Sequence, residues 1–334
     1  MFPLTVACLV TFGFYVASYM RIPIVPLYAK SLGANTPMVG FINSAFFFTA
    51  GLLSFPLGLL ADRLGRKSMA TAGLLLLAAT CFALVYTTTP VHIAIVYVFF
   101  GIGLATYGPT MMSYVADVAP ATHLGRAYGW YTTALYTGMS VGPAVGTWVA
   151  GQRSYEEVFL ASGILTLVLL FALALFLPGT LGLGAGTAPS QSPVGTRRDI
   201  RHNRALWACW LVTLGGCFGL GMFVTFIPLH AREAGVPITH IGLIFFAQGL
   251  SNALARVPFG HLSDRVPSRA YLVVAGVLAT AVALAGFGPA ANLWQFVLCA
   301  ILLGAGMALA FTSIGALIAE AVPARSRGLA MGGY

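Results

Sequence analysis

Long apolar stretches recur along this 334-residue chain and restrict its fold more than any other feature. A helix needs roughly 20 apolar residues to cross a bilayer. Stretches of about this length or longer lie at 3–28, 38–60, 69–88, 91–116, 126–150, 157–178, 205–229, 239–262, 270–288 and 292–319. Because 59% of the residues are hydrophobic and 7% are charged, the chain lacks the polar residues of a water-soluble surface. The sequence therefore predicts an all-α polytopic membrane protein with ten complete spans, since a helix satisfies its own backbone hydrogen bonds in lipid.

The basic residues follow the loops in an asymmetric way. Alternate loops hold only Lys30, Arg153 and Arg232, whereas the other loops hold nearly all the remaining Lys and Arg residues. This is the positive-inside bias, which predicts a multi-pass protein of the cell inner (plasma) membrane with a cytoplasmic N-terminus. The net charge of +9 therefore reports topology and a lipid bilayer as partner, and it does not indicate a nucleic-acid partner.

The chain also repeats itself. A charged turn at 58–67 returns in weaker form at 260–265, and Asp62 and Asp264 are 202 residues apart. At this offset the segments 26–63 and 228–265 align without a gap, with identical residues at Pro26/Pro228, Leu27/Leu229, Ala29/Ala231, Gly33/Gly235, Gly40/Gly242, Pro56/Pro258 and Leu60/Leu262. Two helical units built from one template are the architecture of a secondary transporter, which holds its substrate where the two halves meet.

Residues 179–204 interrupt the hydrophobic pattern with a run rich in Gly, Ala, Pro, Ser and Thr, followed by arginines, which is typical of a flexible linker near lipid headgroups. We expect an N-terminal six-helix bundle at 1–178, a cytoplasmic linker at 179–204 and a C-terminal bundle at 205–334 with four helices and the start of a fifth. At an offset of 203, four residues at the start of the fifth span, Gly125, Ala127, Gly129 and Tyr131, match Gly328, Ala330, Gly332 and Tyr334. We therefore expect twelve spans in the natural protein, with this chain truncated at the start of the eleventh helix.

The repeated segments described above resemble those of the major facilitator superfamily, and the resemblance covers essentially the whole length of the chain. The segment 58–67 fits the signature Gly-x-Leu-Ala-Asp-Arg-x-Gly-Arg-Lys, in the loop after the second span. The segment 138–146 in the fifth span resembles the Gly-x-x-x-Gly-Pro motif of the drug:proton antiporters, and Pro23 to Pro26 resembles their proline-rich first helix. The resemblance implies a major facilitator fold, two six-helix bundles related by the internal repeat, with the second bundle incomplete in this chain.

The signature implies a conformational latch that holds the cytoplasmic side shut while the cavity faces outward. In it, Asp62 accepts hydrogen bonds from the start of the eleventh helix, and Arg66 is placed to pair with Asp117. In the second copy Pro267 and Ser268 depart from the pattern. The alternative is that these charges only set the topology. The latch candidates are Gly58, Asp62, Arg63, Gly65, Arg66, Asp117, Asp264, Arg265, Arg269 and Glu320, with Arg265 or Arg269 answering Glu320.

Small residues spaced by four put a smooth face on the fifth span, at Gly138, Gly142 and Gly146. Pro143 removes one backbone hydrogen bond there and favours a kink. Two interpretations stay open. One is a tight, nearly proton-impermeable seam that favours exchange over open flux, and the other is simple helix packing.

Ionisable side chains at membrane depth are costly and are candidates for function. Arg21 in the first span and Arg256 in the eighth lie at that depth, whereas all eight acidic residues lie in loops or at span ends. Either arginine could bind an anionic group of the substrate, or it could extend its charge to the membrane surface. Gln248 and Asn252 form one polar stripe with Arg256 and are further candidates for the substrate cavity. The aromatic candidates are Tyr19, Tyr107 and Tyr136, which could instead be interfacial anchors. The last candidate is Asn43, which could instead join two helices.

The fourth span departs from the pattern of the related exporters. They commonly carry Arg-x-x-Gln-Gly there, and the corresponding positions in this chain are Tyr97, Phe100 and Gly101. The arginine linked with proton coupling is thus absent from its usual position, so the proton stays an open candidate for the coupling ion. The positions of cysteine and histidine predict no metal site, and we expect no cofactor. No Gly-rich nucleotide loop or nucleophile–base pair indicates an enzyme.

The leading interpretation is a secondary active transporter that moves a small-molecule substrate, drug-like or a metabolite, across the membrane. It would work as a monomer by alternating access. The fifth-span motif favours efflux. The first alternative is an uptake symporter or facilitator of the same fold, which the altered fourth span favours. The second is a truncated membrane protein that does not transport.

Overall fold

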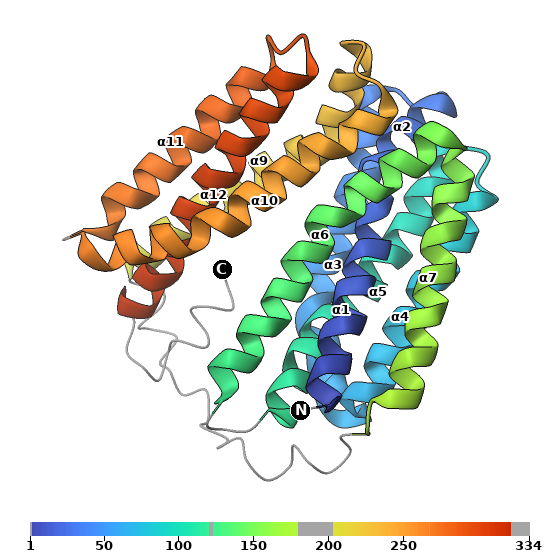
Figure 1. Cartoon of the computed structure of the whole chain (residues 1–334), viewed down its shortest axis with the longest axis horizontal. Helices are drawn as coiled ribbons and strands as arrows, with labels where there is room; N and C mark the ends of the chain where they lie inside the picture. Colours follow the sequence, from blue (N-terminus) through green and yellow to red (C-terminus); the bar gives the residue numbers. More distant parts are fainter. Residues whose placement is uncertain (1, 120–122, 180–202, 267, 322–334) are drawn as a thin grey trace. The chain divides into compact units, whose positions relative to one another are not determined.

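The computed structural model describes residues 2–119, 123–179, 203–266 and 268–321, and these residues form helices without any strand (Figure 1). This agrees with the predicted all-α fold. The helices are α1 (Phe2–Met20), α2 (Ile24–Ser31), α3 (Thr36–Leu64), α4 (Arg66–Val85), α5 (Pro90–Val118), α6 (Leu124–Gln152), α7 (Tyr155–Phe176), α9 (Arg204–Glu233), α10 (Ile238–Arg265), α11 (Arg269–Phe287) and α12 (Leu293–Ala321).

Within these described ranges, nine segments are long and apolar enough to cross a membrane, with α1 and α2 counted together as Phe2–Ser31. Each of the nine coincides with one of the predicted spans. The remaining predicted span, 126–150, is the 29-residue helix α6, which falls outside this set. Its sequence carries Arg126 and many Gly, Thr and Tyr residues, which lower its hydropathy.

The internal repeat is visible in the backbone at the turns that follow α2 and α9. Gly33 and Gly235 occupy the left-handed region with φ of 87° and 82°, where a residue with a Cβ is strained. The Gly33 amide donates to the Lys30 carbonyl and the Ala34 amide to the Ala29 carbonyl, both at 3.0 Å. The same two bonds recur 202 positions later, at 3.1 and 2.9 Å. Both helices therefore end in the same Schellman turn.

Polar side chains define where several helices begin. The amides of Met38, His92 and Glu157 each donate to the capping side chain three residues earlier, at Asn35, Thr89 and Ser154. Such caps satisfy amides that have no partner inside the helix. They fix the starts of α3, α5 and α7.

Backbone contacts divide the chain into two compact units. Unit 1 comprises Met1–Thr187 and Val224–Phe246, and unit 2 comprises Ala188–Phe223 and Ala247–Tyr334. The connected ends of α9 and α10 are therefore grouped with the N-terminal helices. The predicted division into bundles at 1–178 and 205–334 instead assigned α9 and α10 to the second bundle. Most of the predicted linker, residues 180–202, lies outside the described residues.

Inside unit 1, α1 packs against α6 and α7, while α5 packs against α3 and α4. In unit 2, α11 packs along α12, and Leu206, Val273 and Ile314 belong to its buried core. Large apolar side chains also cover the outside, such as Phe55, Leu175 and Trp294, each more than 70% exposed. An apolar exterior of this kind suits contact with lipid.

Candidate functional site

A break in the first span places Arg21 inside unit 1. Helix α1 ends at Met20 and α2 begins at Ile24, with Pro23 between them. Proline has no amide hydrogen and disfavours helical geometry in the residue before it, which explains the break. Arg21 is 1% exposed. The predicted alternative in which Arg21 extends to the membrane surface is therefore wrong for this structure, because the side chain turns into the helix bundle.

The Arg21 guanidinium lies between α4 and α5. Its Nη1 donates to Thr80 Oγ1 at 3.1 Å, and its Cζ lies 3.8 Å from the centre of the Phe100 ring. The contact with the ring face is a cation–π interaction. Arg21 Nε and the Tyr97 hydroxyl are buried without a hydrogen-bond partner among the described residues. None of the ion pairs among the described residues includes Arg21, so its buried charge has no counter-ion within the described ranges.

This position relates Arg21 to the altered fourth span. Phe100 and Tyr97 stand where the resembled exporters carry their glutamine and arginine, and α5 itself supplies no cation there. In the structure the guanidinium of Arg21, in the break between α1 and α2, stacks on Phe100, whose ring centre is 5.4 Å from that of Tyr97. A cation is thus present beside this segment of α5, supplied by the break between α1 and α2. The sequence offered no signal for this, because Arg21 and Thr80 are 59 residues apart.

The three candidate tyrosines have different surroundings. Tyr107 is fully buried, and its ring stacks on Phe14 at 3.8 Å while its hydroxyl lies 3.4 Å from Thr11 Oγ1. Tyr19 and Tyr136 are partly exposed. In this conformation Tyr107 therefore belongs to the packed interior, whereas Tyr19 and Tyr136 stay accessible. That they contact substrate stays a prediction.

The predicted smooth face of the fifth span packs on α1. A Cβ added at Gly138 would lie 2.6 Å from the Phe12 carbonyl oxygen, and one at Gly142 would lie 2.8 Å from that of Val16. One at Gly146 would overlap the carbonyl of Met20. The glycines and the carbonyls both advance by four residues, so the two helices touch through their backbones over three successive turns. The close contact expected from the small residues is confirmed.

The connected ends of α9 and α10 also join unit 1 through specific contacts. Asn43 Nδ2 donates to Thr225 Oγ1 at 3.0 Å, and both side chains are buried. The alternative that Asn43 joins two helices is therefore confirmed in this structure. Gly242 of α10 faces the Pro143 carbonyl and Ala144 of α6, so closely that a Cβ could not fit. Sequence reasoning missed Thr225. For Gly242 there was one signal in the sequence, because the internal repeat aligns it with Gly40.

The signature turn forms an ionic cluster at the predicted cytoplasmic end of unit 1. Arg66 Nη1 forms an ion pair with Asp117 Oδ2 at 2.8 Å, and Arg66 Nη2 donates to Asp62 Oδ1 at 3.5 Å. The predicted Arg66–Asp117 pair is confirmed. Gly65 has φ of 89°, which lets α3 end and α4 begin within one residue. Gly58 instead lies inside α3, and among the described residues no atom comes within 4 Å of a Cβ added there.

The second copy of the latch is described in part. Arg269 Nε donates to the Ser263 carbonyl at 3.2 Å, and Arg265 is exposed, as Arg63 is in the first copy. The side chains of Asp264 and Glu320 lie outside the described residues, and so does the predicted start of an eleventh helix near Gly328. The symmetric clamp therefore stays a prediction.

The two aspartates of the first cluster should differ in their effect on stability. The side chain of Asp117 is 14% exposed and that of Asp62 is 59% exposed. We expect Asp117→Asn to lower the free energy of unfolding by about 1–3 kcal/mol, because it leaves the half-buried Arg66 without its close counter-ion. Asp62→Asn should cost about 0–1 kcal/mol, as for an exposed pair. Denaturation of the purified variants in mixed micelles measures both, and equal losses would contradict the assignment.

The polar stripe of α10 is present in unit 2. Arg256 Nε donates to Asn252 Oδ1 at 3.0 Å, and Asn252 Nδ2 donates to the Gly304 carbonyl of α12 at 3.0 Å. Gln248 Nε2 lies 4.0 Å from Met307 Sδ, also on α12. The stripe therefore faces α12, as expected for polar side chains that avoid lipid. A contact of these residues with substrate stays a prediction.

A sequence model of the Major Facilitator Superfamily matches residues 7–238 and 230–334. Among curated proteins, an uncharacterised MFS-type transporter of Methanocaldococcus jannaschii is 21% identical over 93% of this chain and 80% of its own length. Multidrug resistance protein 2 of Bacillus subtilis is 26% identical over 63% of this chain, and the quinolone resistance protein NorA of Staphylococcus aureus is 22% identical over 71%. The aligned regions span 53% and 61% of these two relatives.

Solved structures resemble the fold. A bacterial homologue of the human lysosomal transporter Spinster, in an inward-facing and unoccupied conformation, superposes with a TM-score of 0.81 at 15% identity, over 98% of this chain and 76% of that one. The nucleoside transporter NupG superposes with a TM-score of 0.78 at 14% identity, over 100% of this chain and 87% of that one. At these identities the likeness concerns the fold alone.

Proposed function

The chain belongs to the major facilitator superfamily, and from that premise we propose that it is a secondary active transporter that moves a small organic molecule by alternating access, with efflux as the favoured direction. We place it in the inner (plasma) membrane as a monomer, with its N-terminus in the cytoplasm. The match to proteins named for multidrug and quinolone resistance supports a drug-like or metabolite substrate.

The seam between α1 and α6 is the observation that supports this proposal most strongly. Gly138, Gly142 and Gly146 bring the two backbones into contact over three turns. A seam without side-chain gaps leaves no room for a file of water molecules between these helices. Solute would then cross only through a conformational cycle, as an exchanger requires. Gly242 of α10 packs tightly on Pro143 and Ala144 of α6, which extends this close contact to a third helix.

The proposed substrate chemistry follows from the candidate residues. Tyr19 and Tyr136 are partly exposed, and their rings would contact the aromatic body of a substrate. Arg21 carries a cation at membrane depth whose Nε has no partner among the described residues. An aromatic molecule with an anionic group matches both features. A quinolone, which has a fused ring and a carboxylate, is a suitable test compound.

An uptake symporter or facilitator of the same fold is the second candidate. The observation that favours it is the fourth span, where Tyr97 and Phe100 replace the arginine and glutamine of the resembled exporters. All eight acidic residues of the chain lie in loops or at span ends, so this sequence supplies no carboxyl group at mid-membrane to carry a proton, which favours the facilitator over a proton symporter.

Flux under an imposed pH gradient tests the proposal and separates the two candidates. The purified protein is reconstituted in liposomes, and the fluorescence of a quinolone reports its movement, with protein-free liposomes as the control for passive permeation. Exchange with protons predicts that an acidic interior drives quinolone inward and that a protonophore abolishes this. Movement in the same direction as the protons would favour the symporter, and flux that ignores the gradient would favour the facilitator. The absence of any protein-dependent flux would reject the proposal for this substrate class.

A further inference from the structure

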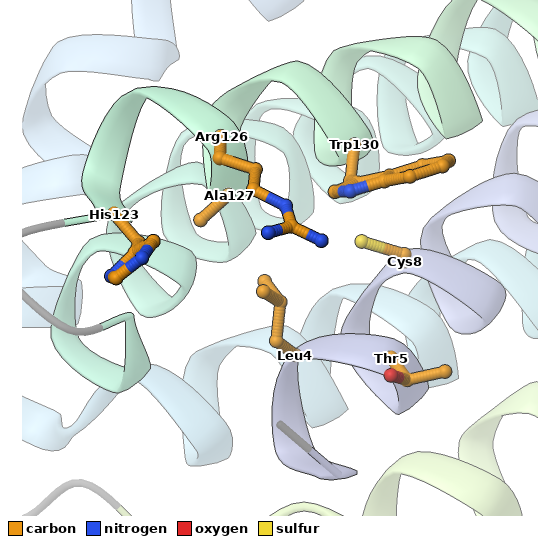
Figure 2. A pocket seen from close by; sticks show the side chains of 7 residues that line it. All are labelled: Leu4, Thr5, Cys8, His123, Arg126, Ala127 and Trp130. Atoms are coloured by element: carbon orange, nitrogen blue, oxygen red, sulfur yellow. The ribbon is translucent and has the colours of Figure 1, made fainter.

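A cavity of about 340 Å³ lies between the first turns of α1 and α6. Figure 2 shows its lining, which comes from two helices that are distant in sequence: Leu4, Thr5 and Cys8 of α1, and Ala127, Arg126 and Trp130 of α6, with His123 just before α6. Its volume falls in the range of small-molecule sites. Cys8 precedes Arg21 by 13 residues, which corresponds to about 20 Å along a helix. The cavity is therefore separate from the Arg21 cluster.

The cavity combines one cation with apolar walls. Arg126 is exposed, and in Figure 2 its guanidinium points across the cavity towards Cys8, beside the indole ring of Trp130. None of the ion pairs among the described residues involves Arg126. Leu4 and Ala127 offer apolar surface next to this charge, and Trp130 is 60% exposed. A ligand that fills the cavity needs an anionic group and an apolar body.

The place of the cavity along the helices indicates where such a ligand comes from. The charge asymmetry predicts that the starts of α1 and α6 lie at the cytoplasmic membrane surface. Arginine and exposed tryptophan side chains are typical of the headgroup level of a bilayer, where they meet phosphates and acyl chains together. A lipid of the adjacent leaflet is present there at high local concentration. Anionic lipids are also the species that a basic pocket selects.

We propose that this cavity binds an anionic phospholipid, with the headgroup phosphate paired to Arg126 and the upper part of an acyl chain along Leu4, Ala127 and Trp130. The site does not depend on the proposed transport function. A lipid bound there connects the starts of α1 and α6, at one end of the helix pair that the glycine seam holds together.

Cys8 provides a local readout of occupancy, because it lines the cavity and is partly exposed. A variant that retains Cys8, with Cys81, Cys209, Cys217 and Cys299 changed to Ala, is labelled with a fluorescent maleimide in detergent. The probes are short-chain phosphatidylglycerol, the matched phosphatidylcholine and inorganic phosphate. We expect phosphatidylglycerol to slow the labelling of Cys8 at concentrations at least about tenfold lower than phosphatidylcholine, since one charged contact is worth about that factor. Inorganic phosphate alone should give no protection.

Substitution of the arginine identifies the contact. Arg126→Gln should remove the preference for phosphatidylglycerol, and Arg126→Lys should retain most of it. Arg204→Gln is the matched control, because Arg204 is also an exposed residue at the start of a helix on the predicted cytoplasmic side, outside the cavity. Equal protection by the two lipids, protection by phosphate alone, or an unchanged preference in Arg126→Gln would each overturn the proposal. If the Arg126→Gln variant does not fold, Arg126→Lys and the comparison of the two lipids in the protein with Arg126 intact still test the proposal.

Discussion

Replacing Arg21 with Gln should lower quinolone transport at least about tenfold while the protein remains folded. A charge buried without a counter-ion has a large desolvation penalty, and proteins retain such a charge in a membrane for function. Arg21 has Thr80 and the Phe100 ring as its neighbours, and no carboxylate of the described chain pairs with it. Removing the charge should therefore leave the free energy of unfolding unchanged or raise it.

The comparison of transport with stability separates function from packing. Arg153→Gln is the control, because the Arg153 side chain is 70% exposed and lies 3.8 Å from Glu157, so both quantities should stay close to the unsubstituted values. Arg21→Lys should recover part of the transport, since it keeps the charge but not the planar stacking on Phe100. If Arg21→Gln transports normally and is less stable, Arg21 has a structural role and the assignment is wrong.

Replacing Gly146 with Leu should lower the free energy of unfolding by about 3 kcal/mol, at the upper end of the usual cost of overpacking. A Cβ at this position overlaps the carbonyl of Met20, which belongs to the backbone of α1 and cannot rotate away. Helices α1 and α6 must then separate, and the seam opens. Transport coupled to a gradient should fall together with stability.

Gly129→Leu is the matched control in the same helix. A Cβ at Gly129 meets no atom within 4 Å among the described residues, and the position is exposed. The same change there should alter stability by less than about 1 kcal/mol, and leucine should even favour the helix. Denaturation in mixed micelles compares the two variants. Equal effects at positions 129 and 146 would show that the contact between the backbones is not what makes Gly146 necessary.

The sequence predicted those features that depend on local pattern. Apolar length located the membrane helices, and the repeat at 202 residues anticipated that Gly33 and Gly235 end their helices in the same way. The glycines of the fifth span predicted a close helix contact because small residues at a spacing of four have few other uses in a membrane. The Arg66–Asp117 pair followed from a signature whose geometry is shared across the resembled family.

Features that depend on contacts between distant helices could not be predicted in this way. Whether Arg21 turns inward or reaches the surface depends on the break at Pro23 and on the space beside Thr80 and Phe100. The partner of Asn43 is 182 residues away, and no spacing rule connects it with Thr225. Nothing in the sequence distinguishes Arg126 from the other basic loop residues, because only the fold places it at a cavity.

A reversible crosslink between α3 and α9 tests alternating access most directly. Asn43 and Thr225 are in hydrogen-bond contact in this structure, so Asn43→Cys and Thr225→Cys, in a protein without other cysteines, can be joined by a short bifunctional reagent that forms a disulfide bond with each thiol. Each single-cysteine variant, treated in the same way, is the control for the reagent. If these helices separate during each cycle, the crosslink should stop protein-dependent quinolone flux, and reduction of the crosslink should restore it. Undiminished flux through the fully crosslinked protein would contradict alternating access at this contact.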